Sequence, residues 1–299
     1  MNTIKKICLI LLPLMILAIC IVVAAVLGYF VFIAIDGRID LDKIISKGAL
    51  IFLLLCIFPA RRWTKLTWSD IGFTTKQAFF RNLGQGFITG ILTLLPVLFS
   101  LYALEINVLD TSKDLSLYFV AKSLLVAIFL ALLISFAEEP LFRGVLLTGY
   151  SRTIGLLAGI FTSSFYYAML HFMKTGKELA LPDASLAGAF DLVADALANT
   201  VNPVNLPAFI ALFVVGCFLA VIREKMQLGM GVCIGCHTAW VMQIKMTKKF
   251  FNTDTHSEYA WLTSSYDGVI GPLVTFWLLL VIFTYLFYSS YKKKQLINV

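Results

Sequence analysis

The stretch SLYFVAKSLLVAIFLALLISFAEEPLFRG, residues 116–144, joins a long apolar run to a short group of charged side chains. Residues 116–138 contain one basic residue, Lys122, and no acidic residue before Glu138. A helix needs about 20 apolar residues to cross the ~30 Å of hydrocarbon in a bilayer, so this run is long enough to span a membrane. It leads into Glu138, Glu139 and Arg143. Ionisable groups inside a membrane are costly, and they are candidates for a functional site.

The composition extends this interpretation to the whole chain of 299 residues. Hydrophobic residues make up 60% and charged residues 14%, and the mean hydropathy is +0.90, whereas soluble domains average about 45–50% and about 25%. These values exclude a soluble globular enzyme, a disordered chain and a disulfide-stapled secreted domain. We expect an all-α polytopic membrane protein that forms a single integral membrane domain over residues 1–299. The eight predicted transmembrane helices are residues 7–35, 44–60, 83–104, 116–138, 154–172, 206–222, 228–244 and 269–289.

The charged residues of the loops predict how these helices are oriented. Cytoplasmic loops of membrane proteins collect Lys and Arg. With the N-terminus inside, more of the basic residues fall on inner loops and most acidic residues on outer loops. Both termini are therefore expected in the cytoplasm, most simply at a bacterial inner membrane. The same bias explains the net charge of +7, so no nucleic-acid partner is expected. Residues 61–82 are expected to form an inner interfacial helix, and residues 173–205 and 245–268 long outer loops.

The two neighbouring glutamates are expected to have different roles. Successive residues of a helix point about 100° apart, so Glu138 and Glu139 face different neighbours. Glu139 and Arg143 are four residues apart and can pair on one face of a helix. This pairing leaves Glu138 as a candidate general base.

Two histidines in later spans lie at depths that let them reach Glu138. If the helix continues beyond Glu138 and turns at residues 151–153, Glu138 and His171 lie roughly 21 Å and 27 Å from that turn, at 1.5 Å per residue. His237 lies nine residues into its span, at a depth of roughly 14 Å. Helix tilt can close that difference. We therefore expect Glu138, the two histidines and the neighbouring ion pair to converge inside the helix bundle.

At these positions the chain resembles the CPBP family of intramembrane proteases, also called the Abi or CAAX-protease type. The motifs of that family are EExxxR, FxxxH and HxxxN or HxxxD, and the resemblance covers about residues 85–245, the expected catalytic core. It implies an intramembrane endopeptidase that works within the lipid bilayer. The reaction implied is hydrolysis of a peptide bond in a membrane-anchored protein or peptide by glutamate-activated water. No particular oligomeric state is predicted.

The resemblance also implies a role for each site residue. Glu138 matches the glutamate that activates water, His171 matches its partner in the second motif, and His237 matches the histidine that stabilises the oxyanion. The supporting residues are Glu139 and Arg143, which match a structural ion pair, and Tyr167, which stands where the family has Phe.

Val241 is a departure from the third motif, because the family has Asn or Asp at this position. An asparagine there would donate to the oxyanion, a contribution of about 3 kcal/mol. Three interpretations remain open. Gln243, Thr238 or Tyr167 replaces the missing donor, the subfamily does without it, or activity is weak or lost. The last interpretation supports an alternative function, a non-catalytic membrane protein of the bacteriocin self-immunity or scaffold type. A proton-relay transporter is disfavoured, because no pair of broken helices in related halves is visible.

The same residues leave the question of a cofactor open. Glu138, His171 and His237 could hold zinc with one open position, or they could activate water without a metal. The resemblance favours no cofactor, with zinc as the alternative. Cys233-Ile-Gly-Cys236-His237 also matches the c-type haem attachment pattern. It lies within an apolar span rich in glycine, where a close helix–helix contact is the expected explanation.

Overall fold

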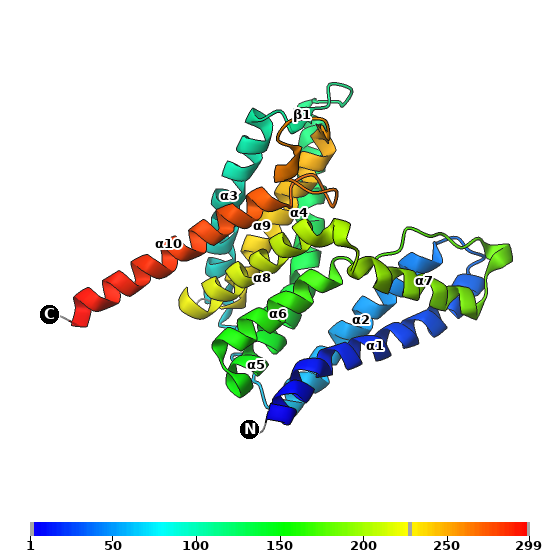
Figure 1. Ribbon diagram of the computed structural model, residues 1–299, viewed down its shortest axis with the longest axis horizontal. Helices are drawn as coiled ribbons and strands as arrows, with labels where there is room; N and C mark the ends of the chain where they lie inside the picture. Colours follow the sequence, from blue (N-terminus) through cyan, green and yellow to red (C-terminus); the bar gives the residue numbers. More distant parts are fainter. Residues whose placement is uncertain (1–2, 227–228, 298–299) are drawn as a thin grey trace.

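The protein is almost entirely helical in the computed structural model, which describes residues 3–226 and 229–297 (Figure 1). Two short strands, β1 (Asn107–Leu109) and β2 (Phe251–Thr253), pair antiparallel. The α-helices are α1 (Thr3–Ala34), α2 (Leu41–Trp63), α3 (Lys76–Ala103), α4 (Leu117–Glu139), α5 (Leu147–Ile154), α6 (Leu156–Leu170), α7 (Leu186–Thr200), α8 (Leu206–Met226), α9 (Met230–Phe250) and α10 (Pro272–Ile297). A π-helix, η1 (Pro140–Leu146), connects α4 to α5, and three short 3₁₀ helices are η2 (Leu181–Asp183), η3 (Pro203–Asn205) and η4 (Ala260–Leu262).

Five helical stretches of the described residues are long and apolar enough to cross a membrane. They are Ile7–Ala34, Lys76–Ala103, Leu117–Ile154, Pro203–Glu224 and Pro272–Tyr291. Many large apolar side chains on these helices are exposed, which suits a surface that faces lipid. The chain is therefore a polytopic membrane protein, as the composition predicts. The predicted number of eight spans is not confirmed: α6 has only 15 residues, and α2 and α9, which carry basic residues in their last turns, are not among the five.

The longest of these stretches runs unbroken from α4 through η1 into α5. Pro140 begins η1 and has no backbone N–H to donate to the preceding turn, which disrupts the α-helical ladder. The wider turn of η1 absorbs this disruption without ending the helix, and such π segments are frequent at functional sites. The helix thus continues past the motif glutamates, as predicted. It ends at Gly155, whose φ of 100° starts the turn into α6, slightly later than the predicted turn at residues 151–153.

Close contact between α3 and α9 forms the centre of the bundle. Glycines face backbone on both helices: a Cβ atom at Gly86 would overlap the carbonyl oxygen of Val232, and one at Gly235 would overlap that of Leu83. Small residues let helix backbones approach in a membrane, where dispersion rather than water exclusion drives packing. The expected role for the glycines of α9 is therefore confirmed. This contact fixes the position of His237, which lies two residues after Gly235.

The structure differs from the prediction in two segments outside the spans, the inner segment 61–82 and the outer segment 173–205. Residues 64–75 form turns instead of part of an interfacial helix, because Asp70 accepts hydrogen bonds from the backbone N–H and hydroxyl of Thr67. These bonds and the partner Arg152 lower the pKa of Asp70 to about 2. The predicted outer loop 173–205 contains α7, which packs against α1 and α2 (Figure 1). The apolar face of α7 is buried there, and this burial stabilises a helix in a segment that has few long apolar runs.

Candidate active site

Three parts of the bundle bring the six predicted site residues together. Glu138 and Glu139 end α4, Arg143 follows in η1, Tyr167 lies near the end of α6, His171 comes directly after α6, and His237 lies in α9. These residues come from segments up to about 100 positions apart in the chain, so tertiary packing alone brings them into contact.

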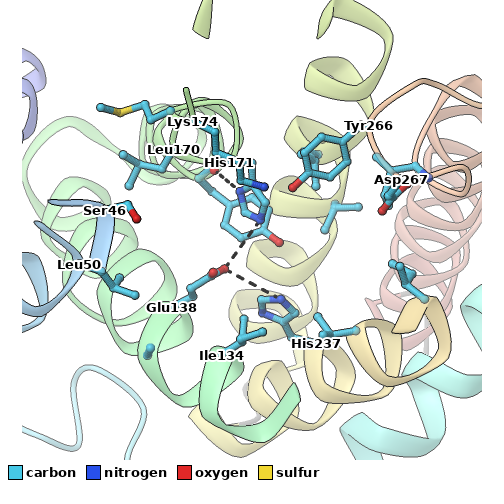
Figure 2. A pocket seen from close by; sticks show the side chains of 18 of the residues that line it. Ser46, Leu50, Ile134, Glu138, Leu170, His171, Lys174, His237, Tyr266 and Asp267 are labelled. Carbon is cyan, nitrogen blue, oxygen red and sulfur yellow. Dashed lines mark hydrogen bonds and ion pairs between the residues drawn. The ribbon is translucent and has the colours of Figure 1, made fainter. Parts of the chain in front are cut away.

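Glu138 lies between the two histidines (Figure 2). Its Oε2 atom is 4.0 Å from Nε2 of His171 and 3.9 Å from Nε2 of His237. This Oε2 atom is shielded from solvent and has no hydrogen-bond partner among the described residues. Both separations are too long for a direct hydrogen bond, yet each leaves room for one bridging water. Glu138 therefore directs an unsatisfied acceptor toward both histidines.

Glu139 forms a second, completely buried set of contacts behind Glu138. Its Oε1 atom is 2.8 Å from Nδ1 of His237 and 3.4 Å from Nη1 of Arg143. Glu139 and Arg143 are 0% and 1% exposed, so neither charge is solvated by water. The structure thus shows the Glu139–Arg143 pair expected from the i, i+4 spacing. It adds His237 as a partner, which the spacing within α4 and η1 could not reveal.

The hydrogen bonds of the two histidines assign their tautomers. Nδ1 of His171 is 2.8 Å from the backbone carbonyl oxygen of Tyr167, and Nδ1 of His237 contacts the Glu139 carboxylate. A carbonyl oxygen and an ionised carboxylate can only accept, so Nδ1 donates in both rings. In the neutral form, each Nε2 atom therefore carries its lone pair toward Glu138.

Tyr167 packs against several other members of the site. Its ring lies 4.5 Å from the ring of His171 and 5.3 Å from that of Phe142, and the guanidinium carbon of Arg143 is 4.2 Å from its centroid. A cation over an aromatic face is stabilised by the quadrupole of the ring. Tyr167 therefore packs against both Arg143 and His171. This packing needs only an aromatic ring, which the Phe of the family motif would also provide.

The three central residues open into a large cavity of about 1070 Å³. Glu138, His171 and His237 line it together with mostly apolar side chains from the surrounding helices. Sites that bind organic ligands are concave and mainly apolar with a few polar groups, and this cavity has that character.

Val241 also lines this cavity, so no side-chain amide or carboxylate stands at this position of the third motif. Of the three predicted substitutes, Gln243 donates to the carbonyl oxygens of Gly90 and Ala239, and Thr238 donates to that of Ile234. Neither lines the cavity, whereas Tyr167 does. The geometry therefore leaves Tyr167 as the candidate donor among the three.

Tyr266 and Asp267 are cavity residues that the sequence did not single out. They come from the loop between η4 and α10, across the cavity from Ser46 and Leu50 of α2 (Figure 2). Burial raises the pKa of Asp267, although its Oδ1 atom accepts hydrogen bonds from the backbone N–H groups of Val269 and Ile270. No motif marks this loop, because only the fold brings it over the site.

Glu and His side chains are ligands that zinc accepts, but those around Glu138 lie farther apart than the ligands of a bound zinc ion. Ligand atoms of tetrahedral zinc are roughly 3.3 Å apart, given bonds of about 2.0–2.1 Å. The 3.9 and 4.0 Å separations around Glu138 are wider. Within residues 3–226 and 229–297, no group of three or more His, Cys, Asp or Glu side chains is arranged to hold a metal. The cysteines of the haem-like pattern, Cys233 and Cys236, are completely buried in the core.

The fold defines a class of protein, a helical polytopic membrane protein, with a buried cluster of Glu and His side chains. Residues 120–242, which contain all three motifs, match the family model described as type II CAAX prenyl endopeptidase Rce1-like. This match confirms the resemblance to the CPBP, or CAAX-protease type, family. Neither the curated proteins nor the solved structures gave a significant match to the chain.

Proposed function

We propose that this protein is an intramembrane endopeptidase that hydrolyses a peptide bond by glutamate-activated water. The observation that carries the proposal is the unsatisfied Oε2 atom of Glu138, which lies about 4 Å from two histidine Nε2 atoms inside a large cavity. The family match supports a protease in general. The substrate that we propose is a membrane-anchored protein or peptide, because the cavity lies among helices that face lipid.

In the proposed reaction, Glu138 acts as the general base and His171 orients the water. A water molecule between the two can donate one hydrogen to Oε2 of Glu138 and the other to the lone pair on Nε2 of His171. Glu138 takes a proton from this water as its oxygen attacks the carbonyl carbon. The protonated Glu138 then gives that proton to the departing amine as the C–N bond breaks, which leaves a carboxylic acid and an amine; the acid then passes its proton to the amine.

His237 is proposed to stabilise the negative charge that develops on the carbonyl oxygen. This role needs a proton on Nε2, hence an imidazolium ring, since Nδ1 already donates to Glu139. The Glu139 carboxylate contacts Nδ1 of this ring and would lie next to its positive charge. Tyr167 is proposed to supply a second donor in place of the missing asparagine. One preorganised donor of this kind contributes about 10²–10³ in rate.

We propose that this chemistry uses no metal, with zinc as the alternative. Purified protein would be treated with 1,10-phenanthroline and its zinc content measured by atomic emission. Unchanged activity at far less than one zinc per chain is expected. Loss of activity that stoichiometric zinc restores would replace the glutamate mechanism with a metal-assisted one.

The orientation of the site is a further part of the proposal. The loop charges favour cytoplasmic termini and an inner turn at residues 151–153, which puts His171 in the outer half of the membrane. Substrates would then approach from mid-membrane or from outside, as exported anchored proteins do. Cysteines placed at Ser151 and Asp183 would be labelled with an impermeant maleimide in intact cells. Labelling is expected at residue 183 only, and labelling of residue 151 would reverse the orientation.

The central test is the variant Glu138→Gln in proteoliposomes. Two probes would be offered, a fluorogenic peptide anchored by one transmembrane helix and a farnesylated CAAX peptide. Loss of a general base lowers rates by about 10²–10⁴, so cleavage should fall below detection while thermal stability is nearly unchanged. The matched control is Glu258→Gln on an exposed outer loop. Full activity of Glu138→Gln would discard the assignment.

The alternative function is a non-catalytic protein of the self-immunity or scaffold type, and Val241 is the observation that supports it. A host that depends on the protein would be complemented with the double variant Glu138→Ala/His171→Ala. Loss of function in this variant is expected if the protein is a protease, and full function would favour the alternative.

A further inference from the structure

Six lysines line the catalytic cavity together with the carboxylates of Asp42, Glu138 and Asp267; of these lysines, Lys43 pairs with Asp40 and Lys249 lies over the ring of Phe119. Lys47 lies on α2, Lys174 follows α6, and Lys245 and Lys248 lie near the end of α9, and all four line the cavity. We refer to these four residues as the lysine rim. In the part of the chain that the structure describes, none of them forms an ion pair within 4.0 Å, whereas Lys43, Lys113 and Lys177 each pair with an aspartate.

Lys174 is close enough to Lys47 and Lys248 to be repelled by them. Burial is the main cause that lowers the pKa of Lys174; repulsion from Lys248 and Lys47 adds to it, and attraction to Asp267 and Glu138 opposes it. Clustered cations in a cavity with apolar walls create a positive potential that attracts an anion. The rim also lies at the end of the bundle predicted to face outward, so the bias of cytoplasmic loops toward basic residues does not explain it.

We propose that the lysine rim binds a carboxylate of the peptide substrate, about three to five residues from the bond that is cleaved. The distance from the carboxylate to the cleaved bond rests on the proposed protease function. On α9, Lys245 and Lys248 lie eight and eleven residues after His237, roughly 12 Å and 16 Å along the helix. An extended peptide spans about 3.3–3.6 Å per residue, so about three to five residues cover these distances.

The position of the rim favours a peptide carboxylate over a lipid headgroup. Val241 and Ile244 line the same cavity on the α9 wall between His237 and the lysines. A substrate that lies along this wall would place apolar side chains against it and reach the lysine rim with a polar end. Lys174 is also only three residues beyond His171, so the rim and the reacting centre share one wall of the cavity on the α6 side.

Peptide binding to the full-length Glu138→Gln protein tests the proposal without turnover. The probes are acylated, apolar decapeptides that carry a neutral dye and a single Asp at each position in turn, with matched Asn peptides. A second series compares a free C-terminal carboxylate with an amide. We expect one narrow window of positions in which the carboxylate improves affinity about tenfold, as charge-assisted hydrogen bonds do, and loses the advantage in 0.5 M salt. Cleavage of the same peptides by the wild-type chain locates the bond relative to that window.

Lysine variants test whether the lysine rim causes this preference for a carboxylate. The triple variant Lys174→Gln/Lys245→Gln/Lys248→Gln should lose the preference for the carboxylate, and the corresponding triple Arg variant should keep it. Lys113→Gln/Lys177→Gln, which removes two lysines that pair with aspartates and do not line the cavity, should also keep it. Thermal stability of each variant confirms folding.

Two results would overturn the proposal. One is equal affinity for Asp and Asn peptides at every position together with equal affinity for carboxylate and amide ends. The other is phosphatidylglycerol retained by wild type and lost from the triple Gln variant, with no effect of the variant on peptide binding, since the rim would then hold lipid. A carboxylate preference without cleavage by wild type would support the rim as a binding site and count only against the protease function.

Discussion

The Nδ1 atom of His237 lies 2.8 Å from Oε1 of Glu139, an oxygen that also lies 3.4 Å from Nη1 of Arg143. One buried carboxylate therefore holds two cationic or potentially cationic groups from different helices. Its contact with His237 fixes the ring so that Nε2 faces Glu138. The second glutamate of the first motif thus orients the histidine of the third, and Glu138 is left to face the cavity.

Replacement of Glu139 by Gln should destabilise the fold more than any other single change in the site. The variant leaves Arg143 buried with no ionised partner, and removal of one member of a buried ion pair costs about 3–5 kcal/mol. The measurement is the thermal unfolding midpoint in detergent, followed with a thiol-reactive dye that reports exposure of the buried cysteines. An unchanged midpoint would show that the pair contributes little to stability.

The double variant Glu139→Gln/Arg143→Met provides the control for that prediction. It removes both charges, so the cost should be clearly less than the sum of the two single variants. Additive costs would mean that Glu139 acts through His237 instead of through Arg143.

Tyr167→Phe should lower kcat by about 10²–10³ and leave KM and stability nearly unchanged, because it removes a hydroxyl that we propose as an oxyanion donor and keeps the ring. Tyr150→Phe is the matched control. Its hydroxyl donates to the carbonyl oxygen of Leu9, and it does not line the cavity. Full activity of Tyr167→Phe would show that the Tyr167 hydroxyl is not the donor, and Tyr266→Phe would then be measured.

Gly235→Ala should destabilise the protein by at least about 1–3 kcal/mol, as overpacking does, because the added methyl group meets the backbone of α3 at Leu83. Gly84→Ala on α3 is the control, since a Cβ atom there has nothing within 4 Å. Alanine favours a helix over glycine by about 0.5–1 kcal/mol, so this control should be slightly stabilising. Equal thermal midpoints for both variants would contradict the close α3–α9 contact.

The Asp267→Asn variant should be more stable than wild type at neutral pH. Burial raises the folded-state pKa of Asp267 above its ordinary value of 3.8. Its contribution to stability is therefore fully present below that value and lost as the pH rises through the raised pKa. An asparagine keeps the Oδ1 acceptor for Val269 and Ile270 and does not ionise.

The thermal midpoint as a function of pH measures this effect. Wild type should lose stability relative to Asp267→Asn as the pH rises from about 4. Asp254→Asn is the control, because Asp254 is exposed and also accepts a hydrogen bond from a backbone N–H through Oδ1. Parallel curves of the thermal midpoint against pH for wild type and Asp267→Asn would show that burial does not raise the pKa of Asp267.

Local features of the sequence were enough to predict several parts of the site. The i, i+4 spacing of Glu139 and Arg143 predicted their ion pair, and the lengths on either side of the turn predicted that Glu138 and His171 lie at similar depth. Both predictions depend only on helix geometry. The third contact of Glu139 could not be predicted in this way, because His237 lies 98 positions away and the rotation of α9 depends on its packing against α3.

The membrane spans and the segments between them also show what the sequence could not predict. Hydropathy placed a helix near each of the eight predicted spans, yet only five helices of the described residues are long and apolar enough to cross a membrane. Helix α7 and the turns at residues 64–75 were not predicted, since burial against α1 and α2 stabilises the first and side-chain hydrogen bonds of Asp70 stabilise the second.

By itself, the sequence determined that the chain is a helical membrane protein and that a few ionisable groups lie inside its apolar segments, because both follow from composition and from the 3.6-residue period of a helix. Only the tertiary structure decided that His237 contacts Glu139, which histidine nitrogens face Glu138, and that Tyr266, Asp267 and the lysine rim line the same space. These features depend on how helices rotate and pack against one another, and small contacts such as Gly235 against Leu83 determine that packing.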